Sequence, residues 1–269
     1  MAFSDPFLVK PGEKVDLSQY DPDYDSGFGP KDEAPKHLEK CEKRLAELQA
    51  LLYAEGKRSL LIVLQGMDAA GKDGTIRHVM SSVNPQSCRV TSFKVPSAEE
   101  ASHDFLWRIH KAVPRHGEIG IFNRSHYEDV LIVRVHDLVP REVWSKRYDQ
   151  INDFEAMLSA NGVHILKFFL RISRQEQLER FKQRIKDPAR NWKISPDDFK
   201  ERPFWKQYTA AYAEALGRCS TKQAPWFVIP ANHKWYRNLA ISRIIVDTLE
   251  GLKMKYPKAS FDTSKIVLK

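Results

Sequence analysis

Residues 60–75 read LLIVLQGMDAAGKDGT, an apolar run that passes directly into a glycine-rich turn and then into a helical pattern. A buried strand, then Gly-x-x-x-x-Gly-Lys, then a helix is the sequence context of a P-loop. Gly66 and Gly71 allow backbone angles at which consecutive amide N–H groups point inward, and Lys72 adds a positive charge beside a helix N-terminus. The stretch predicts a cup for phosphate oxygens, made by Gly66, Asp68, Ala69, Ala70, Gly71, Lys72, Asp73, Gly74 and Thr75.

The turn departs from the usual P-loop at Asp73, which stands where a Ser or Thr hydroxyl normally binds Mg²⁺. A carboxylate at this point repels phosphate, but it can serve a metal or cap the helix. We therefore expect part of the magnesium shell to come from elsewhere, with Asp68 as the candidate within the turn. Taken alone, the stretch is also compatible with a glycine-rich strand-to-helix turn that carries a surface lysine.

Four further apolar runs follow the first one, which spans residues 59–65, and they alternate with helical patterns. They cover residues 89–93, 119–122, 163–172 and 226–229. Strands separated by helices predict an α/β fold with a five-stranded parallel sheet and right-handed crossovers.

Apolar spacing also predicts the helices. One amphipathic helix runs from Leu38 to a stop at Gly56, another spans about 141–160, and the last runs from about 236 to 256. Capping boxes mark two more helix starts, Ser97 with Glu100 and Ser173 with Glu176.

The length of 269 residues fits one large domain. Residues 1–36 are rich in proline and acidic residues without periodic apolar positions, so we expect an extended N-terminal arm before a single P-loop kinase domain at 37–269. No apolar run is long enough for a membrane span and no secretory signal begins the chain, which predicts a cytoplasmic protein without a membrane partner. The three cysteines are odd in number and scattered, so we expect them to be reduced and mostly to pack against other residues.

A second polar motif, FNRSHYEDV at 122–130, follows the third apolar run. Open α/β sheets bind ligands at the carboxyl ends of their strands. A P-loop phosphotransferase needs an acidic group there for a metal and a cation for the developing phosphoryl charge. The candidates are Asn123, Arg124, Glu128 and Asp129, although a capped helix start would also explain the segment.

The chain carries 43 Lys+Arg against 35 Asp+Glu, a formal charge of +8, which favours an anionic partner. Positive charge is concentrated at about 173–207, where we expect a basic lid. Arg180 and Arg184 stand one helical turn apart, off the apolar stripe, and are expected to hold one polyanion together. A solvated helix face, with pairs such as Glu176 to Arg180, is the alternative.

Further phosphate or nucleotide candidates are Lys193 and Arg202 in the lid, with Lys94 and Arg134 just past their strands. The last two are equally typical of surface residues. Trp192 either stacks on a nucleotide base or packs to anchor its loop. His126 is expected to form structural hydrogen bonds rather than act as a base, because a nucleotide phosphate oxygen is already ionised.

The motifs GMDAAGKDG at 66–74, FNRSHYEDV at 122–130 and RNWK at 190–193 together resemble the family-2 polyphosphate kinases. The resemblance extends from LYAEG at 52–56 to KWYR at 234–237. It implies a three-layer, thymidylate-kinase-like P-loop fold with a helical lid, dependence on Mg²⁺, and reversible phosphoryl transfer from inorganic polyphosphate to ADP, GDP or AMP. It also implies that Asp68 is a metal-linked carboxylate, that Lys72 holds phosphate and that Arg124 is the arginine of the second motif.

One departure from the family pattern is Asn123, where many members have Asp. The chain resembles the subgroup with Asn and an added Glu128, in which both AMP and ADP serve as acceptors. We expect Mg²⁺ at Asp68, Glu128 and Asp129, and in-line transfer without a covalent enzyme intermediate.

Two other functions remain open on the sequence. They are an ATP-dependent nucleoside or nucleotide kinase of the same fold and a non-catalytic polyanion-binding protein. The expected partners are polyphosphate and adenine and guanine nucleotides, without nucleic acid. A homo-oligomer, dimer or tetramer, is also expected, with Trp144 or Tyr148 as exposed interface aromatics.

Overall fold

The computed structural model describes residues 3–26, 29, 31–261 and 266. Its centre is a parallel sheet of five strands in the order β2-β3-β1-β4-β5, so the predicted sheet is confirmed. The strands are β1 (Ser59–Gln65), β2 (Cys88–Ser92), β3 (Ile119–Asn123), β4 (Val163–Arg171) and β5 (Trp226–Pro230). Strand β1 lies in the middle and is buried along its whole length, as expected for a parallel strand covered on both faces.

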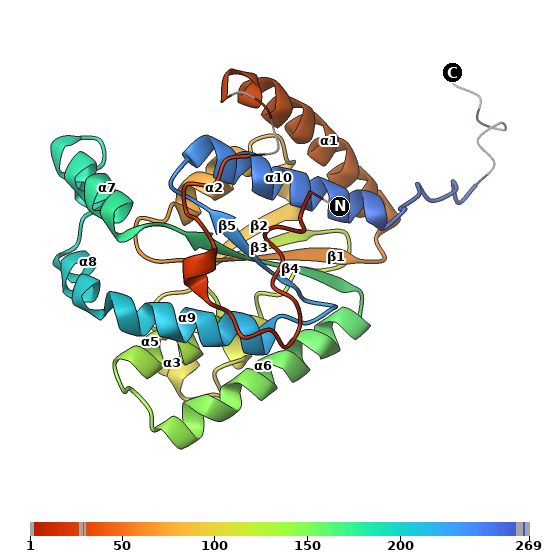
Figure 1. The fold of residues 1–269 in the computed structure, drawn as a ribbon. Helices are drawn as coiled ribbons and strands as arrows, with labels where there is room; N and C mark the ends of the chain where they lie inside the picture. Colours follow the sequence, from red (N-terminus) through yellow and green to blue (C-terminus); the bar gives the residue numbers. More distant parts are fainter. Residues whose placement is uncertain (1–2, 27–28, 30, 262–265, 267–269) are drawn as a thin grey trace.

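Helices cover both faces of the sheet and complete the three layers (Figure 1). One layer contains α1 (Ala34–Glu55), α2 (Lys72–Val79) and α10 (Lys234–Gly251). The other contains α5 (Ile132–Val135), α6 (Arg141–Ala160) and α9 (Trp205–Cys219). The short helices α3 (Ala98–Ala101) and α4 (Trp107–His110) connect β2 to β3. Helices α7 (Arg174–Lys186) and α8 (Pro196–Glu201) lie at the left of the view, in the segment predicted as the lid.

Helix boundaries agree with the sequence where a strong stop signal is present. Helix α1 ends at Gly56, which has a left-handed φ of 63°, as a C-terminal glycine should. Helix α10 ends at Gly251, five residues before the predicted end, and Lys253 is left-handed with a φ of 50°. Apolar residues recur beyond Gly251, so the spacing alone predicted a longer helix than the backbone forms.

The two predicted capping boxes differ. The box of Ser97 and Glu100 is complete. Ser173 accepts a hydrogen bond from the Glu176 backbone N–H, but the Glu176 carboxylate turns to Arg180 instead of returning to the cap. The second box is half formed because a buried arginine takes its carboxylate.

The N-terminal arm packs on the edge of the sheet beside β5. Leu8 forms an antiparallel bridge with Phe227, Val9 N donates to the Trp226 carbonyl at 2.9 Å, and Val228 N donates to the Phe7 carbonyl at 2.8 Å. The side chains of Phe7 and Val9 are buried in the main core. The arm thus pairs with an edge strand that would otherwise present unpaired backbone groups.

The sheet brings the two polar motifs together. Leu64 pairs with Asn123 in the β1–β3 register, so the P-loop after β1 and the second motif after β3 leave the same edge of the sheet on adjacent strands. Parallel strands place their carboxyl ends together, and this edge is where an open α/β sheet binds its ligands.

The prediction that Trp144 and Tyr148 are exposed interface aromatics is wrong. Their exposed fractions are 8% and 0%, because both belong to the apolar stripe of α6 that faces the core. The guanidinium of Arg134 lies 4.8 Å from the centre of the Trp144 ring. Separately, no helix within the described ranges combines the length and apolar character that a membrane span requires.

Candidate active site

The turn after β1 has the backbone of a phosphate-binding loop. Gly66 and Gly71 have φ values of 155° and 107°, and a β-carbon on Gly66 would press against the Leu170 carbonyl at 3.0 Å. Ala69 is also left-handed, with a φ of 62°. Such conformations in non-glycine residues are strained and tend to occur at functional sites.

Lys72 begins α2 and folds back over the loop. Its Nζ donates to the Gly66 carbonyl at 2.7 Å, and only 9% of the residue is exposed. Burial, together with the positive charge of Arg124, lowers the pKa of Lys72 to about 8. One of its three N–H groups is used in this bond, so the ammonium retains donors for an anion in the loop.

Arg124 ties the second motif to the P-loop. Its Nη2 lies 2.9 Å from Asp68 Oδ1 and its Nη1 lies 3.9 Å from Glu128 Oε2. The residue takes a left-handed φ of 61° directly after β3. Beside it, Asn123 Nδ2 donates to Asp73 Oδ1 at 2.8 Å, a second bridge between the two motifs.

These contacts gather two cations and three carboxylates around the mouth of the loop. The charges of Asp68, Glu128 and Asp73 all act on Lys72. Alternating charges of this kind can hold a polyphosphate group, with the cations on phosphate oxygens and the carboxylates toward a divalent metal. The arrangement fits phosphoryl transfer.

Asp129 does not join this cluster. Its carboxylate and its carbonyl both accept from Arg147 Nη1 at 3.0 Å, from α6. Burial raises the pKa of Asp129, against the opposite effect of Arg147 and Arg108. The described residues contain no group of three or more His, Cys, Asp or Glu placed to hold a metal, so the three predicted metal carboxylates do not converge.

Arg180 has a different position from the predicted one. The Arg180 side chain is buried, and each of its five N–H groups has a protein acceptor. Nη1 donates to the Ala69 and Ala70 carbonyls, Nη2 to the Ala231 and Asn232 carbonyls, and Nε to Glu176. Arg180 therefore clamps α7 to the P-loop and is not free to hold a polyanion beside Arg184, because α7 packs directly on the loop.

Gln177 is a second link between α7 and the P-loop that the sequence did not indicate. Its Nε2 donates to the Asp68 carbonyl at 2.9 Å, and its Oε1 accepts from Arg202 Nη1 at 2.7 Å. Arg202 thus supports Gln177 within the lid.

The remaining lid candidates lie on more open surface. Arg184 is half-buried and its charge acts on Asp198 of α8, whose own neighbours include Asp68 and Arg124. Lys193 Nζ lies 3.6 Å from Asp73 Oδ2, so the lid also contacts the start of α2. Trp192 is 73% exposed, and its Nε1 donates to the Ala189 carbonyl at 3.0 Å.

Three further candidates lie outside the charged cluster. Arg134 pairs with Glu214 at 2.6 Å and donates to the Tyr148 hydroxyl, between α5, α6 and α9. Lys94 is exposed beyond β2. Thr75 is buried and its hydroxyl donates to the Gly71 carbonyl at 3.1 Å, a bond within the first turns of α2. None of these three side chains is held in the charged cluster.

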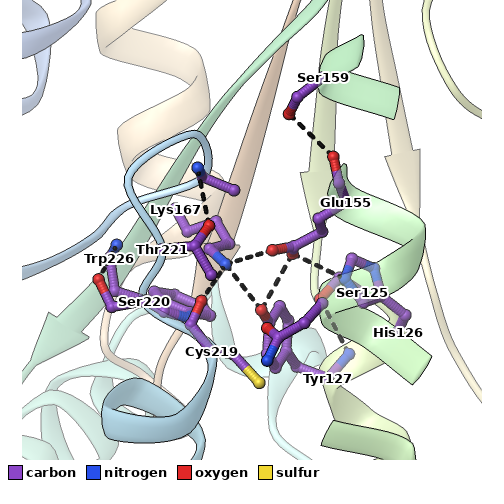
Figure 2. Close-up of polar contacts among 12 residues, drawn as sticks. Ser125, His126, Tyr127, Glu155, Ser159, Lys167, Cys219, Ser220, Thr221 and Trp226 are labelled. Atoms are coloured by element: carbon purple, nitrogen blue, oxygen red, sulfur yellow. Dashed lines mark hydrogen bonds and ion pairs between the residues drawn. The ribbon is translucent and has the colours of Figure 1, made fainter. Parts of the chain in front are cut away.

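A buried polar network supports the second motif from behind (Figure 2). Lys167 of β4 forms an ion pair with Glu155 of α6 and donates to the Tyr127 hydroxyl at 2.8 Å and the Cys219 carbonyl at 2.7 Å. Glu155 Oε1 lies 3.1 Å from His126 Nε2. Since His126 and Tyr127 belong to the second motif, the network fixes the turn that carries Glu128. His126 makes the structural contact that was predicted for it.

The signal for this network was present in the sequence. Lys167 stands in the middle of an apolar strand, and Glu155 lies on the apolar stripe of α6 between Ile151 and Leu158. A charged residue at a core position is nearly always paired. The pairing partners become apparent only when α6 and β4 are placed side by side.

The fold and the site define a P-loop phosphotransferase, with a lysine-bearing phosphate loop, an arginine and a carboxylate that follow the neighbouring strand, and a basic segment linked to the loop. Residues 29–257 match the family model Polyphosphate kinase 2 (PPK2). The chain belongs to the polyphosphate kinase 2 family.

Individual relatives agree with this assignment. The chain is 51% identical over 263 residues to an AMP/ADP-polyphosphate phosphotransferase of Meiothermus ruber, covering 97% of this chain and 98% of the relative. It is 46% identical to an ADP-polyphosphate phosphotransferase of Rhodopseudomonas palustris, covering 94% and 92%. The crystal structure of Polyphosphate Kinase 2 from Arthrobacter aurescens TC1 superposes with a TM-score of 0.94 at 43% identity, covering 98% of this chain and 94% of that one.

Proposed function

We propose that this chain is a polyphosphate-dependent nucleotide kinase, which moves the terminal phosphoryl group of inorganic polyphosphate reversibly to ADP, GDP and AMP. The observation that carries the proposal is the meeting of Lys72, Arg124 and Asp68 at the mouth of the P-loop. The names of the Meiothermus ruber and Rhodopseudomonas palustris relatives support polyphosphate with ADP and AMP.

The proposed chemistry is an in-line transfer between two polyphosphorylated ligands without a covalent enzyme intermediate. The acceptor oxygen of a nucleotide phosphate is already ionised at neutral pH, so no protein base is required. Lys72 and Arg124 stabilise the charge that spreads over the transferred group. The lid, linked to the loop by Gln177 and Arg180, excludes water, which would otherwise compete as the acceptor.

Mg²⁺ is the proposed cofactor, and the donor set fits it. Magnesium keeps several waters and is bound in such sites by one or two carboxylates together with substrate phosphates, so a full protein cage is not needed. Asp68 and Glu128 are the residues that would hold it, on either side of Arg124. Bound magnesium would neutralise phosphate oxygens. Asp129 is not part of this proposal because Arg147 occupies its carboxylate.

Polyphosphate binding is assigned to the open cations of the lid. The candidates are Lys193, which lies near Asp73, and Arg184, whose charge acts on Asp198. A chain with a negative charge at each phosphate can bind such a track at many lengths. Trp192 has an exposed ring that is available to stack on a nucleobase.

The acceptor range follows from the subgroup motif with Asn123 and Glu128. Asn123 is neutral and donates to Asp73, which leaves Glu128 as the second carboxylate beside Arg124. We assign both AMP and ADP, with guanine nucleotides as further acceptors. A cytoplasmic location and a homo-oligomeric state, dimer or tetramer, complete the proposal.

The test is a nucleotide-phosphorylation assay with polyphosphate as sole donor and AMP, ADP, GMP and GDP as separate acceptors. ATP formed from ADP and polyphosphate in the presence of Mg²⁺, and lost with EDTA, is the expected result. Activity that strictly requires ATP as donor would identify an ordinary nucleotide kinase. Salt-sensitive polyphosphate binding without turnover would identify a polyanion-binding protein. The matched control is Lys72→Met, which should bring turnover to background.

A further inference from the structure

Arg237, in the first turn of α10, lies directly behind the phosphate loop. It is 2% exposed and its Nη1 donates to the Ala70 carbonyl at 3.2 Å. A β-carbon on Gly71 would overlap Arg237 Nη1, and one on Gly74 would lie 3.5 Å from Nη2. The guanidinium therefore fills the space that these two glycines leave open, in contact with the start of α2.

The charge of Arg237 has no carboxylate partner among the described residues. Its Nε and Nη2 both donate to the neutral Asn238 Oδ1, at 3.1 and 2.8 Å. The charged groups beside it, Arg180 and Lys234, are also cations. Burial and the charge of Arg180 lower the pKa of Arg237 to about 9. Arg180 differs in this respect, because Glu176 pairs with it at 2.8 Å.

A buried guanidinium with a neutral partner and a cationic neighbour destabilises the fold unless another charge compensates it. A phosphate group in the cup formed by this same turn would bring the missing negative charge. The same backbone carbonyls that Arg237 and Arg180 hold from behind belong to the peptide units of the cup.

We propose that Arg237 is a positioning residue of the phosphate loop, which turns the Ala70 carbonyl away from the ligand and couples its own uncompensated charge to phosphate binding. Fixing this carbonyl behind the loop leaves the adjacent amide N–H groups facing the anion. A bound phosphate offsets the repulsion between the positive charges of Arg237 and Arg180. Ligand affinity therefore depends on Arg237, although Arg237 does not touch the ligand. The inference rests on the proposed function, since it requires a phosphate in the loop.

The neighbouring Asn238 allows a nearly isosteric test. In Asn238→Asp, a carboxylate takes the place of the amide that accepts from Arg237 Nε and Nη2. The guanidinium then has a permanent counter-ion and the protein without ligand is stabilised. Charge coupling predicts weaker affinity for an anion in the loop, and unchanged affinity contradicts it.

The experiment is calorimetric titration of the full chain with tripolyphosphate alone and with ADP alone. The ligand whose Kd rises in Lys72→Met is the one that occupies the loop. For that ligand, Arg237→Met and Asn238→Asp should each raise Kd by roughly tenfold, the effect of one nearby charge at an intermediate dielectric. Arg243→Met removes an exposed cation, paired with Asp247, from the same helix and should leave Kd unchanged. The unfolding midpoint of Asn238→Asp should equal or exceed that of the unmodified chain.

Two outcomes would overturn the inference. One is a Kd within twofold of the unmodified chain for Asn238→Asp, which remains informative even where Arg237→Met does not fold. The other is that Lys72→Met binds both tripolyphosphate and ADP with the same Kd as the unmodified chain. In the first case polyphosphate-driven turnover is intact and only the role of Arg237 is lost, whereas in the second the phosphate loop itself, and with it the proposed function, is contradicted.

Discussion

Arg124 Nη2 lies 2.9 Å from Asp68 Oδ1, and this ion pair joins the end of β3 to the loop after β1. The two residues are 56 positions apart in the chain, yet the β1–β3 register places them at one sheet edge. Arg124 is thereby aimed at the mouth of the phosphate cup before any ligand arrives, and Asp68 is held where it can share its charge with a cation. Preorganised charge of this kind is the main means by which proteins lower barriers to phosphoryl transfer.

Replacing Arg124 should therefore abolish most activity without unfolding the chain. Arg124→Ala is expected to lower kcat by roughly 10²–10³-fold, the usual effect of removing one preorganised donor. Arg124→Lys should recover a fraction of this loss because it retains charge without the planar fork. The matched control, Arg218→Ala, removes an exposed arginine whose partners are Asp149 and Glu214. Steady-state kinetics in which Arg124→Ala keeps more than about a tenth of the original kcat would be inconsistent with its assigned role.

Lys72 should make the folded state more stable at high pH. Its pKa falls from 10.5 in the unfolded chain to about 8 when folded, which corresponds to about 3 kcal/mol of lost folding free energy at neutral pH. Below pH 8 both states carry the proton and the full penalty applies. Between pH 8 and 10.5 only the unfolded state retains it, so stability rises with pH.

The check is urea unfolding of the unmodified chain and of Lys72→Met at pH 7, 9 and 10. Lys72→Met should be the more stable protein at pH 7, and the difference in unfolding free energy should shrink as the pH approaches 10. A difference that does not depend on pH would mean that the lysine is not desolvated in the folded state.

The fold was predictable because its signals are local. The strand at 59–65, the stop at Gly56 and the helix at 141–160 each depend on apolar spacing or on one residue with a special backbone angle. The P-loop and the second motif were identified for the same reason. Their juxtaposition followed from the rule that parallel strands present their carboxyl ends at one edge.

The positions and partners of the individual charged side chains could not be predicted from the local sequence pattern. Arg180 and Arg184 are one turn apart and chemically identical, but Arg180 is buried against the P-loop, whereas Arg184 is half-buried and its charge acts on Asp198 of α8. Asp129 follows Glu128 directly, yet α6 supplies Arg147 to it. In each case a long-range packing contact decides whether the charge is used for structure or left for a ligand.

This difference between Arg180 and Arg184 gives a paired prediction. Arg180→Met removes five hydrogen bonds, which join α7 to the P-loop and to the segment between β5 and α10, and should lower the unfolding midpoint by several degrees. Arg184→Met should leave the midpoint unchanged and raise KM for polyphosphate by roughly threefold to tenfold, as expected for one open phosphate contact. Thermal unfolding and initial rates measured side by side decide the matter. The reverse pattern would contradict the assigned positions of the two arginines.

The buried network behind the second motif should show strong coupling. Lys167→Met leaves Glu155 buried without its cation and should cost roughly 3–5 kcal/mol of stability. Glu155→Gln should also be destabilising, whereas the double variant should cost less than the two single changes together, because neither charge is then left unpaired. A double-mutant cycle by urea unfolding measures this coupling. Additive effects would indicate that Lys167 and Glu155 do not depend on each other.

The most direct measurement of the central claim is a crystal structure of the chain with tripolyphosphate and ADP bound. We predict a phosphate group in the turn between Gly66 and Lys72, with backbone amide nitrogens and Lys72 Nζ at about 3 Å from its oxygens. Arg124, in the second motif, should contact the phosphate group that lies between the two ligands. A structure in which every phosphate lies away from that turn, with Lys72 still bonded to the Gly66 carbonyl, would contradict the account.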